Sequence, residues 1–202
     1  MVQLFVDGGG FMWPILFIFI IGFVFVGERL YHLVKGLASN EDFALEVAST
    51  LEKSGTKAAQ DMCNQSMGPV ANLCSSALEK ADKGVEAVEK TLDQSGTIEM
   101  ASMEKNMTWI SLCIATAPML GFLGTVWGMI QAFNDIKMAN DISPAVVAGG
   151  ISVALLTTAF GLVVAVVLQI LQNAVMYIID NQIVVLQKSS IILLDAVEKK
   201  KQ

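Results

Sequence analysis

Charged residues are absent from three long stretches of this chain of 202 residues. Residues 8–27, 106–134 and 142–179 contain no Asp, Glu, Lys or Arg. A helix needs about 20 mainly apolar residues to cross the hydrocarbon core of a bilayer, and each stretch is long enough. The hydrophobic fraction of 54% and the mean hydropathy of +0.59 also exclude an ordinary soluble globule. The sequence therefore predicts an all-α integral membrane protein with three long transmembrane helices and additional cytoplasmic helices.

Residues that carry catalysis or bind metals are also scarce. The single histidine, His32, follows the first uncharged stretch, where an interfacial position suits its amphipathic ring. The three cysteines, Cys63, Cys74 and Cys113, show no metal-ligand spacing, so we expect neither a metal site nor a cofactor. Hydrolytic catalysis needs a nucleophile with a base, a carboxylate pair or a metal. The serines and threonines of the uncharged stretches have no His, Lys or Asp beside them, so we expect no catalytic residues and no enzyme activity.

Basic residues are fewer than acidic ones, with 13 Lys and Arg against 19 Asp and Glu. Most of the net charge of −6 arises between Glu28 and Lys105, and this acidic balance argues against nucleic acid as a partner. Apolar residues in the same segment recur at helical spacing, which predicts several helices. Gly55, Gly68 and Gly96 are the expected breaks between them.

The positions of the basic residues predict the orientation in the membrane, because Lys and Arg gather on the cytoplasmic side. None precedes Glu28, whereas Arg29 and Lys35 follow the first stretch and Lys105 precedes the second. The first helix is expected to be retained, since Glu28 and Arg29 stand where a signal peptide would have a small-residue cleavage site. The chain is therefore predicted to be a multi-pass protein of the bacterial inner membrane, with a periplasmic N-terminus and a cytoplasmic C-terminus.

This topology divides the chain into six segments. They are 1–36 (periplasmic segment and first transmembrane helix), 37–104 (cytoplasmic helices), 105–138 (second transmembrane helix), 139–144 (periplasmic turn), 145–188 (third transmembrane helix with a cytoplasmic extension) and 189–202 (cytoplasmic tail). An impermeant thiol reagent outside the membrane should therefore label a cysteine placed at Asn140. It should not reach Cys63 or Cys74 until the membrane is opened.

Small and hydroxyl residues form stripes at helical spacing in the second and third stretches. The stripe residues are Gly121, Gly124, Thr125, Gly128 and Ala132 in one, and Gly150, Ser152, Ala154, Thr157, Thr158, Gly161 and Ala165 in the other. One interpretation is helix packing, because small residues let backbones approach closely in lipid. The other is a surface that faces a partner helix or a narrow pore. There the hydroxyls of Thr125 and Thr158 would both donate and accept hydrogen bonds.

Three segments of the sequence resemble those of a known family. Residues 11–30, 117–129 (APMLGFLGTVWGM) and 150–162 (GISVALLTTAFGL) are similar to the three transmembrane helices of ExbB and TolQ proteins, within the MotA/TolQ/ExbB proton channel family. The order, the spacing and the predicted topology agree along most of the chain. The run at 117–129 is specific, whereas the cytoplasmic segment is not.

The resemblance implies a homopentameric ring in membrane lipid. Its second and third helices would surround single-span helices from an ExbD- or TolR-like partner, whose membrane aspartate carries the proton. Thr125 and Thr158 match the threonines that line the pore, and Thr157 and Ser152 near them are also expected to line the ion pathway. Residues expected to pack against the partner helices are Pro118, Gly121, Gly124, Gly128, Ala154, Gly161 and Ala165. One departure is Val153, where many ExbB and TolQ chains carry a glutamate.

The function implied is a motor subunit that couples an ion gradient to work across the cell envelope, such as TonB-dependent transport with a TonB-like protein. The missing intramembrane carboxylate fits a ring whose partner carries the ion, since ionisable groups in membrane helices are usually functional. The expected ion is H⁺, with Na⁺ left open because hydroxyls serve either ion. The alternatives are a structural membrane scaffold without ion conduction and a flagellar or gliding stator subunit.

Overall fold

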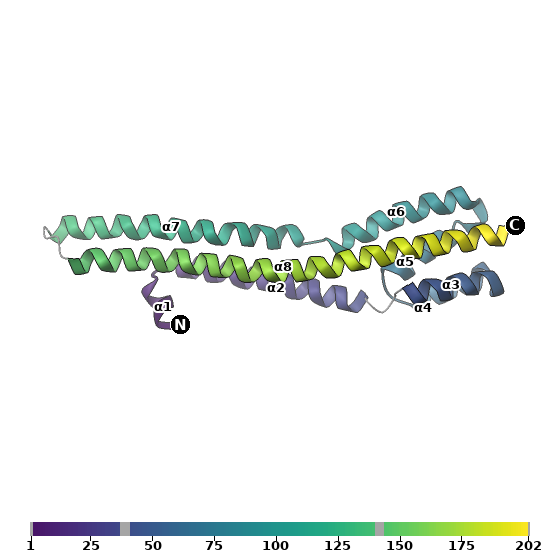
Figure 1. Cartoon of the computed structure of the whole chain (residues 1–202), viewed down its shortest axis with the longest axis horizontal. Coiled ribbons are helices and arrows are strands. Elements are labelled where there is room, and N and C mark those ends of the chain that lie inside the picture. Colours follow the sequence, from purple (N-terminus) through teal and green to yellow (C-terminus); the bar gives the residue numbers. More distant parts are fainter. Residues whose placement is uncertain (1, 37–40, 140–143, 202) are drawn as a thin grey trace. The chain divides into compact units, whose positions relative to one another are not determined.

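The computed structural model describes residues 2–36, 41–139 and 144–201, and the elements within them are all helical (Figure 1). In chain order they are α1 (Val2–Asp7), α2 (Met12–Gly36), α3 (Glu41–Ser54), α4 (Thr56–Gln65), α5 (Pro69–Leu78), the short 3₁₀ helix η1 (Ala81–Lys83), α6 (Val85–Met103), α7 (Met107–Ala139) and α8 (Pro144–Lys201). Three long helices of the described chain, α2, α7 and α8, are apolar enough to cross a membrane. The all-α prediction with three long apolar helices is confirmed.

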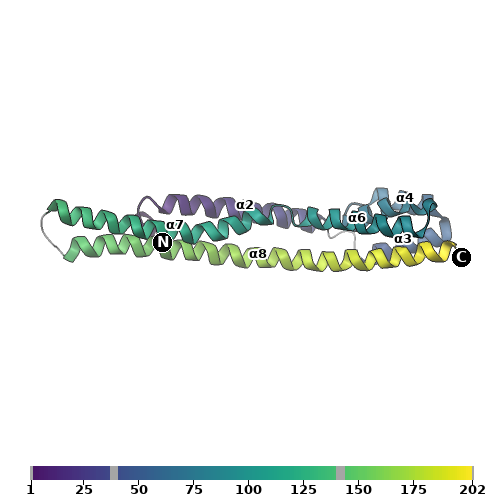
Figure 2. The same ribbon diagram turned by 90° about the horizontal axis from the view of Figure 1, so that it is seen from above.

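The chain separates into two compact units, and α2 and α8 contribute to both. The spanning unit consists of residues 1–28 and 106–174, and the bundle unit of residues 29–105 and 175–202. Within the spanning unit α7 and α8 lie side by side (Figures 1 and 2). Ile15 of α2 joins Cys113, Ala117 and Leu168 in a buried apolar cluster, which packs α2 onto the α7/α8 pair.

The chain reverses between α1 and α2 at a run of glycines, Gly8–Gly10. Gly9 has φ +74°, a left-handed conformation that residues with a side chain rarely adopt. The reversal brings the Phe5 ring of α1 to 5.4 Å from the Trp13 ring of α2 and to 6.5 Å from the Phe160 ring of α8. The short α1 is therefore held by aromatic contacts with two long helices.

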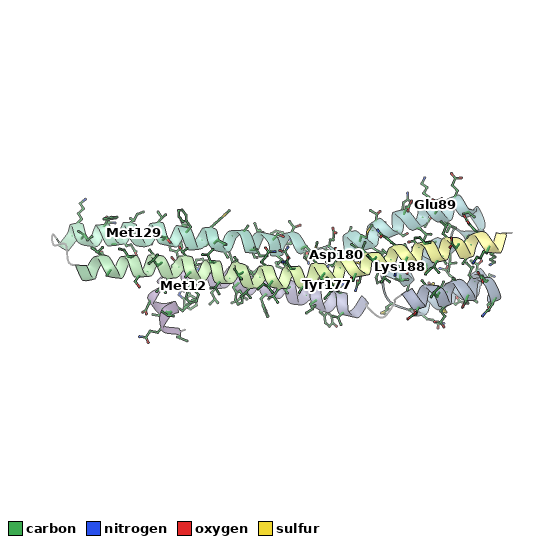
Figure 3. The ribbon with its side chains drawn as sticks, viewed as in Figure 1. Met12, Glu89, Met129, Tyr177, Asp180 and Lys188 are labelled. Carbon is green, nitrogen blue, oxygen red and sulfur yellow. The ribbon has the colours of Figure 1, made fainter. Side chains whose placement is uncertain are left out.

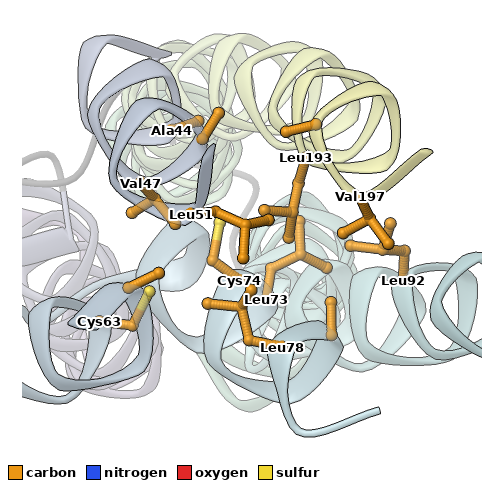
Figure 4. Close-up of a cluster of buried hydrophobic side chains, with 14 of the residues drawn as sticks. Ala44, Val47, Leu51, Cys63, Leu73, Cys74, Leu78, Leu92, Leu193 and Val197 are labelled. Carbon is orange, nitrogen blue, oxygen red and sulfur yellow. The ribbon is translucent and has the colours of Figure 1, made fainter. Parts of the chain in front are cut away.

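The bundle unit contains α3–α6, η1 and the C-terminal part of α8 around an apolar core (Figure 4). Its central side chains include Leu51, Leu73 and Leu193, each with no exposed surface. Burial of a leucine side chain contributes about 1.5–3 kcal/mol, so this core supplies much of the stability of the unit. The stretch from residue 189, expected as a tail, instead continues α8 to Lys201 because its apolar face enters this core.

Glycines end the helices of the bundle unit at two of the three expected places. Gly55 (φ +88°) precedes α4 and Gly68 (φ +142°) precedes α5, whose first residue is proline. The expected break at Gly96 is wrong, because Gly96 is buried within α6. The break lies instead at Gly84 (φ +111°), directly before α6.

Polar side chains fix the end of α2 within the bundle unit. Arg29 is only 2% exposed and donates to the carbonyl of Ser102 at 3.2 Å. Gln182 of α8 donates to the carbonyl of Leu33 at 3.2 Å. Leu33 is in the last turn of α2, where carbonyls have no partner within the helix. Figure 3 shows Tyr177, Asp180 and Lys188 along the part of α8 that contributes to this unit.

Candidate ion-pathway site

Thr125 of α7 and Thr158 of α8 meet within the spanning unit, and their hydroxyl oxygens are in direct contact. The Thr125 hydroxyl donates to the carbonyl of Ala154 at 3.0 Å and lies 3.3 Å from the carbonyl oxygen of Gly121. The Thr158 hydroxyl donates to the carbonyl of Gly121 at 3.2 Å. We refer to these two hydroxyls and two carbonyls as the hydroxyl cluster. Both threonines are half-buried, so one side of the cluster is open.

Glycine allows the two helices to approach closely enough to form this cluster. A Cβ atom added at Gly121 would lie 2.9 Å from the carbonyl oxygen of Thr157 and 3.1 Å from the Cα atom of Thr158. At Gly161 it would lie 2.6 Å from the carbonyl oxygen of Ala117. Contacts this close to backbone atoms leave no room for a methyl group. The small-residue stripes of α7 and α8 therefore pack against each other within one chain.

Thr157 lies beside the hydroxyl cluster and is almost fully buried, with 1% of its surface exposed. Its hydroxyl donates to the carbonyl of Ala154 at 2.8 Å, so this carbonyl accepts from both Thr157 and Thr125. Gly124 leaves room for the Thr157 side chain, because a Cβ atom added at Gly124 would lie 2.7 Å from the Thr157 hydroxyl oxygen. Gly128 faces Ala154 in the same way, because a Cβ atom added at Gly128 would lie 3.3 Å from the Ala154 Cβ atom.

The structure does not bring the other predicted residues into the hydroxyl cluster. Ser152 lies on an exposed face of α8, and its hydroxyl makes no hydrogen bond within the described part of the chain. Ala165 is buried one turn beyond Gly161. Pro118 is half-buried inside α7, where its missing N–H leaves the carbonyl of Ile114 without its helical donor.

The hydrogen bonds of the cluster limit what it can bind. Each threonine hydroxyl has one proton and two acceptor lone pairs. The cluster has two hydroxyl protons for three contacts, which are those to the Ala154 and Gly121 carbonyls and the one between the two hydroxyls, so neither proton is left for the open side. The open side therefore presents lone pairs. It suits a protonated carboxylic acid or a small hydrated cation better than an ionised carboxylate, which has no proton to donate.

A cavity of about 330 Å³ lies in the spanning unit, and Thr157, which is next to the hydroxyl cluster, is part of its lining. Its lining residues are Gly8, Gly9, Gly10, Phe11, Pro14, Gly124, Trp127, Gly128, Gln131, Val153 and Thr157. The sequence reasoning gave no role to Gln131 or to the segment Gly8–Gly10. The run of three glycines was the available signal, because glycine runs accompany close approach or unusual backbone conformation.

Comparison with known proteins decides the family. Residues 65–188 match the MotA/TolQ/ExbB proton channel family, and this range includes the hydroxyl cluster and about half of the bundle unit. The chain belongs to this family. The match covers more than half of the 202 residues and confirms the resemblance carried by the runs at 117–129 and 150–162.

Named relatives agree with the family. The chain is similar to a biopolymer transport protein ExbB homolog of Methanothermobacter thermautotrophicus, with 32% identity over 183 residues, or 90% of this chain. It is 27% identical over 165 residues, or 80% of this chain, to an ExbB-like protein of Synechocystis. It is 41% identical over 81 residues, or 40% of this chain, to biopolymer transport protein ExbB of Xanthomonas campestris pv. campestris. The chain spans 65% of the length of the first two relatives and 32% of the third.

The family and the three long apolar helices together identify a multi-pass membrane protein of the proton channel family. The hydroxyl cluster lies at the contact between two of those helices. Residues 106–134 and 142–179, the stretches that contain this cluster, have no Asp, Glu, His, Lys or Arg. The site therefore combines hydrogen-bonding oxygens with an apolar setting that supplies no charge of its own.

Proposed function

We propose that this chain is the ring subunit of an ion-driven motor in the bacterial inner membrane. Five copies surround the single transmembrane helices of an ExbD- or TolR-like partner, and the ring and partner couple a proton gradient to work across the envelope. The N-terminus is periplasmic and the C-terminus cytoplasmic. TonB-dependent transport is the process we favour, because the named relatives are biopolymer transport proteins of the ExbB type.

The observation that carries the proposal is the hydroxyl cluster in an uncharged setting. A chain that moves protons through lipid needs a group that gains and loses them, and such groups are costly and functional there. Residues 106–134 and 142–179 contain no Asp, Glu, His, Lys or Arg, so in this proposal a partner supplies the proton-carrying group. A partner aspartate fits the open side of the cluster, where Thr125 and Thr158 present oxygen lone pairs.

The direction of hydrogen bonding suggests how the ring handles the two protonation states of that aspartate. A protonated carboxyl can donate to a lone pair of Thr158 without disturbing the bond from Thr158 to Gly121. An ionised carboxylate needs a donor, so Thr158 would have to release that carbonyl. In the proposed cycle the neutral acid is therefore held at the ring, and ionisation weakens its contact and allows the partner helix to move on.

A structural scaffold without ion conduction is the second candidate. It is favoured by the packing of Gly121, Gly124, Gly128 and Gly161 between helices of the same chain, which needs no partner to explain it. The two functions differ in whether a single-span partner binds and whether ions move.

The test is co-expression of the chain with a candidate partner from the same organism, a single-span membrane protein that has an aspartate in its span. Native mass spectrometry of the purified complex should show five copies of this chain together with the partner. Liposomes containing the complex should acidify under an imposed proton gradient, and replacing the partner aspartate with asparagine should stop this. A monomer or dimer in mild detergent would exclude the ring. A pentamer with the partner bound but no proton influx would favour the scaffold. Ion influx driven by a sodium gradient would show that the transported ion is Na⁺ and not H⁺.

A further inference from the structure

The cavity lined by Gly8–Gly10 has polar atoms that the protein leaves unpaired. Gly8 is buried, and its N–H donates to the carbonyl of Leu4 at 3.1 Å. Within the described part of the chain the Gly8 carbonyl accepts no hydrogen bond. A buried carbonyl without a partner costs about 1–3 kcal/mol, so native structures usually satisfy it with protein or ordered water.

Two side chains add polar groups to the same cavity. The Gln131 amide makes no hydrogen bond within the described residues. The Thr157 hydroxyl donates its hydrogen bond to the Ala154 carbonyl, so its lone pairs remain free to accept. An ordered water needs two to four polar partners and room for at least roughly 10–15 Å³. The cavity, with a volume of about 330 Å³, meets both requirements.

The width of the cavity depends on residues without long side chains. Gly124 and Gly128 line its wall on α7, and a Cβ at Gly124 would displace Thr157. Across from them, the Gly9 Cα lies so near α8 that an added Cβ would be 3.4 Å from Val153. The short Val153 side chain lines the cavity and leaves this space free.

The cavity also adjoins the hydroxyl cluster through Thr157. Thr157 lines the cavity and shares the Ala154 carbonyl with Thr125, which belongs to the cluster. A carbonyl accepts but does not relay protons, so this link orients water and does not form a proton wire. What the cavity can supply is solvent next to the contact of the two threonines.

We propose that the Gly8–Gly10 cavity is a binding site for a cluster of ordered water, held by the Gly8 carbonyl, Gln131 and Thr157. This water is the outer approach by which a hydrated proton comes to the hydroxyl cluster of the same chain. The water site stands on the geometry alone, and only its use as an approach rests on the proposed function. Lipid acyl chains are the competing occupant, favoured by Phe11 and Trp127 in the lining.

Thiol chemistry tests the occupant without any partner or ion transport. A methanethiosulfonate reagent that carries a quaternary ammonium reacts with thiolates, which form in water and not in lipid. The full chain with Val153→Cys, in lipid nanodiscs, should react at least about tenfold faster than Leu155→Cys, because only position 153 faces the cavity. Leu155 lies two residues away on α8 and is 63% exposed, so it is the matched lipid-facing control. The unmodified chain measures the background from its buried cysteines.

The result that supports the water site is fast labelling at 153 that slows when Gln131→Leu is added. Equal, slow labelling at 153 and 155 would show a lipid-filled or dry cavity and overturn the water site.

The role of the water as an approach for protons is tested by Val153→Phe, which fills the cavity, in the complex used for proton influx. Influx should fall about tenfold or more, with Leu155→Phe unchanged and pentamer yield normal. Normal influx in Val153→Phe would overturn the approach role. Absence of influx in the unmodified complex would count against the proposed function, while the labelling result would stand.

Discussion

Thr125 and Thr158 are the residues on which the proposed mechanism depends, and their environment is unusual for membrane threonines. A threonine hydroxyl in a helix commonly donates a hydrogen bond to a carbonyl of its own helix, as Thr116 does to the Leu112 carbonyl at 2.6 Å. Thr158 instead donates across the helix pair to Gly121, and Thr125 donates across to Ala154. Thr125 also lies 3.3 Å from the Gly121 carbonyl of its own helix, but each hydroxyl has a partner on the neighbouring helix.

Replacing Thr158 with valine should separate a motor from a scaffold. Valine keeps the branched shape but removes the oxygen that would meet the partner carboxyl. Leaving the O–H of the partner carboxyl buried without an acceptor costs about 1–3 kcal/mol, or roughly five- to a hundredfold in rate if the cost falls on the limiting step. We expect proton influx to fall by this factor, measured in liposomes, while pentamer yield is unchanged because a membrane hydrogen bond averages only about 0.6 kcal/mol.

Three companion variants make this result specific. Thr116→Val removes a hydroxyl that bonds its own helix and should leave influx unchanged. Thr125→Val should be milder than Thr158→Val, and serine at position 158 should restore most of the influx. Full activity in Thr158→Val would leave packing as the whole role of this threonine.

At the scale of elements, the contact between α7 and α8 is made by backbone rather than by large side chains. Gly121 and Gly161 face each other, and a Cβ at Gly161 would lie 3.1 Å from the Gly121 Cα. Dispersion contacts and aligned hydrogen bonds hold such helices together in lipid, where no hydrophobic driving force acts between them. The contact is therefore sensitive to a single added methyl group.

Gly161→Ala should destabilise the spanning unit. The new methyl group would lie 2.6 Å from the Ala117 carbonyl oxygen, so the helices have to separate. Overpacking of this kind costs about 1–3 kcal/mol. The measurement is the free energy of unfolding in mixed detergent and SDS. Gly149→Ala is the matched control on the same helix, because a Cβ there has nothing within 4 Å and stability should not fall. Equal stability of the two variants would mean that α7 and α8 do not pack through Gly161.

At the scale of the whole molecule, the structure changes how the topology has to be tested. Cys63 and Cys74 are 2% and 0% exposed, so a thiol reagent should fail to label them from either side while the fold persists. The hydrogen bond with Cys63 and burial raise the pKa of the Cys74 thiol, which lowers its reactivity further. The two native cysteines are therefore poor reporters of the side of the membrane on which the bundle unit lies. Asn140, chosen as the outer position, lies outside the described residues.

Met67 offers a better reporter of the proposed orientation. It is 76% exposed in the segment between α4 and α5 of the bundle unit, so Met67→Cys should react with an impermeant maleimide as soon as the reagent has access. In spheroplasts we expect no labelling until the membrane is permeabilised, and then rapid labelling, measured by a gel shift. The unmodified chain is the control for the native cysteines. Labelling of Met67→Cys in sealed spheroplasts would place the bundle unit outside and invert the topology.

The sequence by itself determined the class of the protein and its family. Uncharged stretches of sufficient length can only be accommodated in lipid as helices that satisfy their own backbone, so composition alone predicted the three long apolar helices. The run at 117–129 carried the family because its glycines, proline and threonine occur at fixed spacing. Local conformation was also predictable where one residue decides it, as at Gly55 and Gly68.

Only the tertiary structure decided which surfaces those residues meet. Helical spacing places Gly121, Thr125 and Gly128 on one face, but it does not say whether that face meets the same chain or another. The structure pairs it with α8, directs the threonine protons into Gly121 and Ala154, and leaves lone pairs on the open side. It also places Gly96 inside α6 and gathers Gly8, Gln131 and Thr157 around one cavity. These relations join residues far apart in the chain, and packing rather than local periodicity sets them.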